Sequence, residues 1–562
     1  MYILGISCYY HDAAACLIKD GIIIAAAEEE RFTRVKHDNS FPINAINYCM
    51  KQAGISANKI SYIGFYEKPI VKFERIIQTF TECYPFGFWL FYKTIPSWVN
   101  EKLRIKSIIK KKLNFKKEVL FIDHHSSHAA SAFFVSPFKK AAILTVDGVG
   151  EWVTGSIKIG ENNRIFALKE IHFPDSLGLL YSTITAFLGF KVNNDEYKVM
   201  GLAAYGTPKY EKEFRKLVKI NSNGSFCMDM KYFDYRNKTR MWSDEFEKLF
   251  GNPRKPDSAI EKIHEDIAAT LQKITEKVYF KMANHAYKLT KFENLCIAGG
   301  VGLNSVANGK LFQKTPFKRI FVQPAATDAG GAIGVAYFIW HHILNENRNF
   351  EMDSAYYGPQ FTNDEIFRFL RKNKIKYKKL SRKELLHTAA QAITEDKIVG
   401  WFQGRMEVGP RALGNRSILA NPINPEMKDI VNNKIKHRED FRPFAGSVMI
   451  EKVNDFFAVP EIKHNSPFMT FVFDVKDEKR KLIPAITHLD GTCRIQTISK
   501  KQNPLYYDLI KEFERLTGVP IILNTSFNLK GEPIVCTPLE AYNDFIKTPM
   551  DYLILGNYLI SK

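Results

Sequence analysis

Two histidines four residues apart are the sharpest chemical signal in the sequence. His124 and His128 lie in the run IDHHSSHAASAFF, and this spacing brings two side chains onto one face of a helix. Two imidazoles with a carboxylate from elsewhere suit Zn(II) or Fe(II). Asp147 and Asp328 are the candidate carboxylates. The alternatives are a helix N-cap for Asp328 and local hydrogen bonding for the histidines.

Glycine-rich turns follow apolar strands at residues 147–150, 298–302 and 328–331. Backbone amides in such turns can cradle phosphate, and residues without bulky side chains let a nucleotide approach closely. Tight connections between strands and helices are the alternative. The three turns together predict a nucleotide cleft.

Cations gather in a second region, between residues 404 and 448. They are Arg405, Arg411, Arg416, Lys436, Arg438 and Arg442, and Arg494 is a further candidate. The planar fork of arginine suits phosphate or carboxylate, so we expect a compact anionic ligand, with surface ion pairs as the alternative for several of them. Asn524, placed just after an apolar strand, adds a polar group.

The elements that must position these groups come in a repeated pattern. Residues 2–29 read as three strands with Asp20-Gly21 as a hairpin turn, and residues 141–171 repeat three strands with Asp147-Gly148 at the first turn. Such a duplication fits the actin-like ATPase architecture. A helical stretch, the strand NLCIAGG, the strand RIFVQ and the glycine-rich turn TDAGGAIGVA then complete an α/β domain.

A change in character near residues 352–360 marks a domain boundary, and we divide the 562 residues into 1–352 and 353–562. The aromatic and basic segment 84–117 is too short to span a bilayer; we expect a helical insertion, with contact to a membrane or acceptor as the alternative. The net charge of +20 would attract polyanions or phosphorylated substrates, although lysine-rich compositional drift explains it equally well.

The eight cysteines form no C-x-x-C pair, so neither a disulfide framework nor a cysteine zinc site is expected. No run is apolar enough for a spanning helix, and the start MYILGISCYYHDAA does not resemble a signal peptide. We therefore expect a cytoplasmic protein.

A resemblance to a known family rests on motifs along nearly the whole chain. They are GISCYYHDAAACL, EEERFTRVKHD, DHHSSHAASAFF, TVDGVGE, YKVMGLAAYG, AGGVGLN, ATDAGGAIGVA, GRMEVGPRALGNRSI, FRPFAG, DGTCRIQT and LNTSFNLKGEPIV. In this order they resemble the O-carbamoyltransferases of nodulation-factor and antibiotic biosynthesis, the NodU/CmcH type.

The resemblance implies an α/β protein in which a duplicated actin-like domain is followed by a YrdC-like domain. It implies that the second domain cleaves carbamoyl phosphate and that the carbamate attacks ATP, accompanied by Mg(II), to give carbamoyl adenylate. The first domain would then transfer the carbamoyl group to a hydroxyl.

The resemblance also assigns roles to residues. It implies His124, His128, Asp147 and Asp328 as ligands of Fe(II) or Zn(II), and His11 as the base that accepts the proton of the hydroxyl. Carbamoyl phosphate would bind Arg411, Lys436, Arg442, Arg494 and Asn524. We expect Lys198, Gly299, Gly300 and Asn304 in the adenylate pocket.

The acceptor is expected to be a small molecule or glycan, with a sugar hydroxyl preferred, and neither nucleic acid nor a membrane span is expected. A homodimer stays open. Two alternatives compete: a transfer RNA modifier that uses the same adenylate chemistry, and an actin-like sugar kinase or nucleotide-binding module. The histidine pair and the arginine-rich second domain have no evident role in a sugar kinase.

Overall fold

The computed structural model describes residues 1–460 and 465–562 and divides into two compact units. The first unit comprises Met1–Ala26, Asn39–Ala307 and Leu311–Glu351. The second comprises Ala27–Asp38, Asn308–Lys310 and Met352–Lys562. The division at residue 352 lies where the change in sequence character occurs, but the sequence did not anticipate that two short earlier segments belong to the second unit.

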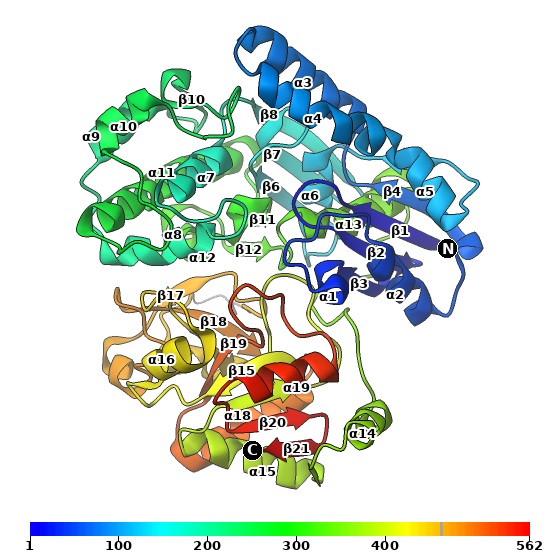
Figure 1. The fold of residues 1–562 in the computed structure, drawn as a ribbon, viewed down its shortest axis with the longest axis vertical. Helices are drawn as coiled ribbons and strands as arrows, with labels where there is room; N and C mark the ends of the chain where they lie inside the picture. The colour runs from blue at the N-terminus through cyan, green and yellow to red at the C-terminus, as the bar shows by residue number, and fades with distance from the viewer. Residues whose placement is uncertain (461–464) are drawn as a thin grey trace. The chain divides into compact units, whose positions relative to one another are not determined.

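The first sheet of the first unit is formed by the amino-terminal hairpins. It contains β1 (Tyr2–Ser7), β2 (Ala14–Lys19), β3 (Ile22–Glu28), β4 (Ile60–Phe65) and β5 (Val119–Phe121), in the order β3-β2-β1-β4-β5. Figure 1 labels the first four of these strands. β1 pairs antiparallel with β2 and parallel with β4. Asp20 and Gly21 both have positive φ at the β2–β3 turn, as the tight hairpin signal predicts.

The second sheet repeats this plan. It contains β6 (Lys140–Val146), β7 (Val153–Glu161), β8 (Arg164–His172), β11 (Asn294–Ala298) and β12 (Arg319–Val322), in the order β12-β11-β6-β7-β8. β6 pairs antiparallel with β7 and parallel with β11, as β1 does with β2 and β4. The predicted duplication of an α/β half-domain is therefore confirmed.

Two helices pack on these sheets and on each other. α6 (His124–Phe133) contacts β6 and β11, while α13 (Asp328–Tyr337) contacts β1 and β2. A Cβ on Gly334 of α13 would lie 1.8 Å from the carbonyl oxygen of Ser127 on α6, so only glycine permits this approach. The segment TDAGGAIGVA, expected as a turn, is thus mostly helix, because its small residues serve helix packing.

Helices make up much of the rest of the first unit. The segment 84–117 is largely helical, since α3 (Pro69–Cys83) is followed by α4 (Phe88–Asn100) and α5 (Ile105–Leu113). Phe80 and Phe91 stack between α3 and α4 with ring centroids 4.1 Å apart. Among the described residues, no helix combines the length and apolar character needed to cross a bilayer.

The second unit is built on one mixed sheet of nine strands, in the order β13-β21-β20-β14-β15-β19-β16-β18-β17. The strands are β13 (Lys378–Lys379), β14 (Val399–Phe402), β15 (Arg416–Ala420), β16 (Ala445–Met449), β17 (Val472–Asp474), β18 (Thr492–Ile498), β19 (Ile521–Ser526), β20 (Tyr552–Leu555) and β21 (Tyr558–Ser561). The helices α15 (Arg382–Thr394) and α18 (Pro504–Thr517) pack on each other, and α18 contacts β16 and β19. The unit is α/β, and its assignment as YrdC-like stays a prediction.

The early segment Ala27–Asp38 belongs to the second unit through specific bonds. The Arg31 guanidinium donates to the carbonyl oxygen of Gly409 at 2.8 Å, and Arg34 donates to that of Ile534 at 2.7 Å. Glu28 accepts a bond from the Gly409 amide at 2.5 Å. The charged motif EEERFTR therefore anchors the arginine-rich loop that contains Gly409.

Candidate functional site

The four predicted metal ligands converge in the first unit. His124 and His128 lie on α6, Asp147 directly follows β6, and Asp328 is the first residue of α13. Asp123 caps α6 by accepting a hydrogen bond from the Ser126 amide. Neither imidazole is therefore needed to cap the helix. All four ligand side chains are buried, and their ligand atoms lie within 4.8 Å of one another.

The distances among these atoms fit a single metal ion. The Nε2 atoms of His124 and His128 are 3.0 Å apart, and His124 Nε2 is 3.0 Å from an Asp147 oxygen. Asp328 Oδ1 lies 3.6 and 3.8 Å from the two imidazole nitrogens. Since bonds to Zn(II) are about 2.1 Å long, donors around one ion lie roughly 3–3.5 Å apart. The donor set of two imidazoles and two carboxylates is also one that Zn(II) or Fe(II) accepts.

The electrostatics of the cluster favour a bound cation. Burial disfavours the charged imidazolium, yet the carboxylates of Asp328 and Asp147 raise the pKa of His124 to about 9. Burial also raises the pKa of Asp328. In contrast, the two imidazoles outweigh burial and hold the pKa of Asp147 well below its usual range. Asp328 is thus the carboxylate whose charge is least compensated, and a divalent ion would compensate it.

Neighbouring groups hold the ligands in place. Tyr66 donates to Asp328 Oδ2 at 3.3 Å, and the Gly300 amide donates to Asp147 Oδ1 at 3.0 Å. The Glu151 carboxylate accepts the His124 amide at 3.1 Å. Sequence reasoning missed Tyr66 and Glu151, although Glu151 closes the motif TVDGVGE. The expected N-cap alternative for Asp328 is not realised, because Thr327 precedes it as the N-cap.

His11 lies in the turn between β1 and β2, as expected. Its Nδ1 is 2.8 Å from an Asp12 oxygen, and its Nε2 contacts the carbonyl oxygen of Asn193. Burial opposes the charged form, but Asp12 raises the pKa of His11 to about 10. A general base must begin neutral, so His11 has to release its proton and its contact with Asn193 before it can act.

The predicted adenylate pocket is partly engaged in structural bonds. Gly299 has a φ of +91°, and a Cβ there would lie 2.3 Å from the Val146 carbonyl oxygen. The Gly300 amide already bonds to Asp147. Asn304 caps α12 (Ser305–Lys314) and pairs with the Gln272 amide in both directions, at 2.9 and 3.1 Å.

Lys198 lies on α8 (Glu196–Leu202) and forms an ion pair with Asp195 at 3.1 Å. Its ammonium stands over the Phe190 ring, 5.6 Å from the centroid. The role of Lys198 in nucleotide binding, like that of Gly299, Gly300 and Asn304, stays a prediction.

In the second unit, the sheet brings two of the predicted anion-binding residues into one row. Arg494 on β18 and Asn524 on β19 both pair with Ala445 of β16, so the three side chains share one face of the sheet. Asn524 lies within its strand rather than after it. Arg494 Nε and Asn524 Oδ1 are buried without a hydrogen-bond partner among the residues that the structure describes.

The loop that carries Arg411 is tied to the same face. Gln496 donates to the Leu413 carbonyl oxygen at 2.7 Å, and Asn524 donates to that of Ala412 at 3.4 Å. Glu407 shapes the loop by accepting the amide of Leu413 at 2.7 Å. Sequence reasoning missed Glu407 and Gln496, whose roles appear only once the loop closes over the sheet.

The cations of this region are crowded together. Burial and the charge of Arg494 hold the pKa of Arg411 well below its usual range, and burial lowers that of Arg494 to about 10. Burial and the charges of Arg438 and Arg442 likewise lower the pKa of Lys436. A bound anion would relieve this repulsion.

The Lys436 ammonium is held by dipoles. It donates to the carbonyl oxygens of Ser526 and Asn528, the second at 3.0 Å, and to Asn528 Oδ1 at 3.0 Å. Arg442 lies 3.7 Å from Glu439. The residues predicted to bind carbamoyl phosphate thus lie on this face of the sheet or interact with residues beside it. They are Arg411, Lys436, Arg442, Arg494 and Asn524.

Two other arginines of the segment are structural instead. Arg405 donates to the carbonyl oxygen of Tyr357 at 2.7 Å. Arg416 is fully buried, stands over the Phe402 ring at 3.7 Å and donates to the carbonyl oxygen of Pro359 at 3.0 Å. These bonds connect the two arginines to the backbone of neighbouring loops.

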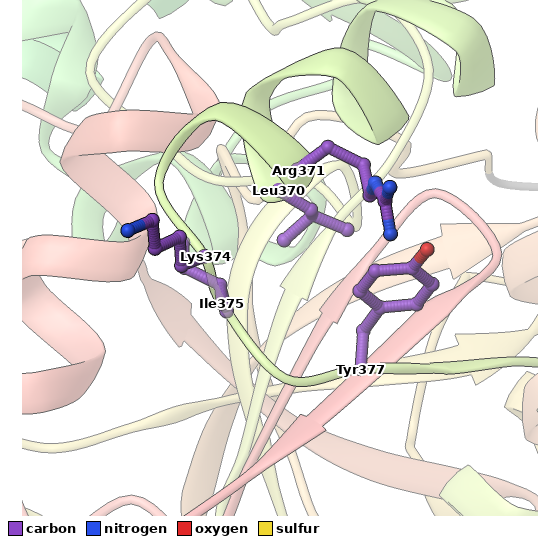
Figure 2. Close-up of a pocket in the computed structure, with 5 residues that line it drawn as sticks. All are labelled: Leu370, Arg371, Lys374, Ile375 and Tyr377. Atoms are coloured by element: carbon purple, nitrogen blue, oxygen red, sulfur yellow. The ribbon is translucent and has the colours of Figure 1, made fainter.

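A surface pocket of the second unit lies outside these networks. Leu370, Arg371, Lys374, Ile375 and Tyr377 line it (Figure 2). None of them was predicted to carry chemistry, and none takes part in the bonds that hold the anion-binding candidates. We therefore assign the pocket no part in the reaction.

Comparison with known proteins gives matches along nearly the whole chain. The model described as carbamoyltransferase N-terminus matches residues 2–337, and the model described as carbamoyltransferase C-terminus matches residues 390–562. An uncharacterized protein of Synechocystis sp. is 48% identical over 100% of this chain and 97% of its own length. Nodulation protein NolNO of Sinorhizobium fredii is 37% identical over 99% of this chain and 79% of its own length. Nodulation protein U of the same species is 31% identical over 73% of this chain and 72% of its own length.

Proposed function

The chain belongs to the carbamoyltransferase family and is a carbamoyltransferase, and we propose that it transfers the carbamoyl group in two stages, with ATP and carbamoyl phosphate as co-substrates. The first stage takes place in the second unit and the second stage in the first unit. Support comes from the two sets of charged side chains, one cationic and one able to bind a metal ion.

In the first stage, Arg411, Lys436, Arg442 and Arg494 bind the phosphate of carbamoyl phosphate. Water cleaves it to carbamate and phosphate, and the carbamate oxygen attacks the α-phosphorus of ATP, so that carbamoyl adenylate forms and pyrophosphate leaves. The crowded cations neutralise the phosphate. The Asn524 amide, held by Ser447 at 3.0 Å and Gln496 at 3.1 Å, orients the carbamoyl end.

In the second stage, the adenylate binds in the first unit. His124, His128, Asp147 and Asp328 would hold a Zn(II) or Fe(II) ion, which supplies Lewis-acid polarisation of the donor when bound. Gly299 and Gly300 let the nucleotide approach the turn after β11, while Lys198 and Asn304 complete the predicted pocket.

His11 accepts the proton of the acceptor hydroxyl in this proposal. The hydroxyl takes the place of the Asn193 carbonyl at Nε2, and the Asp12 carboxylate on Nδ1 stabilises the imidazolium that forms. The hydroxyl oxygen then attacks the carbamoyl carbon, and AMP leaves. We propose a sugar-containing metabolite or glycan as the acceptor, in line with the nodulation proteins among the relatives.

The observation that carries the proposal is the row of Arg494, Ala445 and Asn524, where a small residue leaves room between a guanidinium and an amide on one sheet face. The test is to incubate the purified chain with ATP, Mg(II) and carbamoyl phosphate. We expect AMP and pyrophosphate to form only when carbamoyl phosphate is present. Formation of ADP instead, or AMP formation that is indifferent to carbamoyl phosphate, would refute it.

A further inference from the structure

Arg75 is a buried arginine of the first unit that the reaction above does not use. It lies on α3, and only 8% of its surface is exposed. Its Nε atom is buried without a hydrogen-bond partner, and none of the ion pairs found among the described residues includes Arg75. The guanidinium stands over the Phe173 ring, 4.9 Å from the centroid. Burying such a charge without compensation is costly.

Arg254 in the same unit shows how the fold otherwise treats a buried arginine. It is also 8% exposed and stands over a phenylalanine ring, that of Phe190, at 4.8 Å. However, Arg254 Nε donates to the Leu188 carbonyl oxygen at 2.6 Å, and its Nη1 donates to that of Ser258. The described part of the fold therefore provides hydrogen-bond acceptors for Arg254 but none for the Nε atom of Arg75.

The nearest acidic groups are already engaged. Glu67 forms an ion pair with Lys72 at 2.5 Å, and Glu151 accepts the amides of His124 and Lys68. Burial lowers the pKa of the Arg75 guanidinium. The carboxylates of Glu67 and Glu151 oppose this shift only from longer range.

The surroundings connect Arg75 to the transfer site. Lys72, one helical turn earlier, stands over the Tyr10 ring at 4.2 Å, and Tyr10 is the residue before His11. Burial raises the pKa of the Tyr10 hydroxyl, and the negative charges of Asp147 and Asp328 raise it further. Tyr10 also acts electrostatically on Arg75. The Arg75 guanidinium thus lies close to the residue that precedes His11, and this residue in turn lies close to the carboxylates of the metal site.

We propose that Arg75, with Phe173 and Tyr10 beside it, binds an oxyanion of a substrate of the second stage. Two sources share this chemistry: the phosphate in the AMP half of the carbamoyl donor, and an acidic group on the acceptor. The assignment rests on the proposed function for its substrates, but the binding itself can be tested without turnover.

The experiment is calorimetric titration of the full chain with AMP against adenosine, and with glucuronate against glucose. Wild type, Arg75→Met, Arg75→Lys and Arg254→Met are compared. Because a hydrogen bond to a charged group is lost, we expect Arg75→Met to bind at least one charged probe about 10- to 100-fold more weakly. Arg75→Lys should keep part of the affinity, and Arg254→Met should bind like wild type. Weakening confined to AMP identifies the donor, and weakening confined to glucuronate identifies the acceptor.

Thermal unfolding of the same variants gives a second readout. Arg75→Met removes an uncompensated charge and should unfold at or above the wild-type temperature, whereas Arg254→Met loses hydrogen bonds and should unfold below it. The proposal is overturned if Arg75→Met binds every probe as wild type does, or if wild type binds neither charged probe better than its neutral control. Equal destabilisation of the two methionine variants also overturns it. AMP formation by wild type is measured separately, so failure of the proposed function remains distinguishable.

Discussion

Arg494 and Asn524 face the same side of the sheet, one on each side of Ala445. This relationship gives a specific expectation for carbamoyl phosphate. Arg494→Met keeps the length and apolar packing of the side chain but removes the charge, so we expect the KM for carbamoyl phosphate in AMP formation to rise roughly 30- to 1,000-fold.

Arg438→Met is the matched control. Arg438 stands over the Phe444 ring at 4.5 Å and donates to Asn432 Oδ1 at 2.6 Å, so it contributes packing and charge in the same region. Its KM should stay within a few-fold of wild type. Equal effects of the two variants would remove Arg494 from the binding site.

The second prediction concerns the metal. His128→Ala removes one of four buried donors, and we expect metal content measured by mass spectrometry to fall from one ion per chain to a small fraction of that. The control is His125→Gln, because His125 lies on the same helix and bonds instead to Thr145 Oγ1 at 2.7 Å. A folded His128→Ala variant with full metal occupancy would exclude this residue as a ligand.

The sequence allowed much of this site to be predicted, for reasons that particular residues make clear. The spacing of His124 and His128 fixes their common helix face, and apolar strands with glycine turns identify where Asp147 and Asp328 lie. Asp20-Gly21 likewise predicts its hairpin. Each of these signals comes from a few neighbouring residues, so it can be read without knowledge of the tertiary structure.

Other features depend on packing that no local pattern encodes. The sequence predicted a turn where α13 begins at Asp328, because a run of glycines is typical of turns. The structure shows that one of these glycines, Gly334, is needed for close packing against α6. Glu407 and Gln496 act through a loop closed over a sheet, and Arg75 differs from Arg254 only in what surrounds it. Long-range partners of this kind become visible only in the folded chain.

The third prediction tests the close packing of α6 and α13. In Gly334→Ala, the added Cβ would meet the backbone at Ser127, which cannot move like a side chain. We expect overpacking to lower the unfolding free energy by about 1–3 kcal/mol and to reduce metal content. In the control Gly155→Ala, the nearest atom would be 3.4 Å away, an ordinary contact. The packing argument fails if calorimetry finds Gly334→Ala no less stable than this control.

The fourth prediction concerns pH and a buried acid of the second unit. Burial, reinforced by Glu532, raises the pKa of Asp544 to about 7 from an ordinary value of 3.8. A carboxyl whose folded pKa is raised destabilises the fold as pH rises from its unfolded pKa through its folded pKa. Asp544→Asn should therefore unfold a few degrees above wild type at about pH 8, with little gain at about pH 4. A gain that is the same at both pH values would contradict this origin.

The division of labour between the two units is the central claim, and His128→Ala tests it most directly. This variant should retain the first stage and lose the second, so carbamoyl adenylate should accumulate when ATP, Mg(II) and carbamoyl phosphate are supplied. Mass spectrometry of the quenched reaction should find an ion heavier than AMP by one carbamoyl group, more abundant than in wild type given an acceptor. If the folded variant instead consumes ATP and carbamoyl phosphate without that ion, or yields ADP, the two-stage account is contradicted.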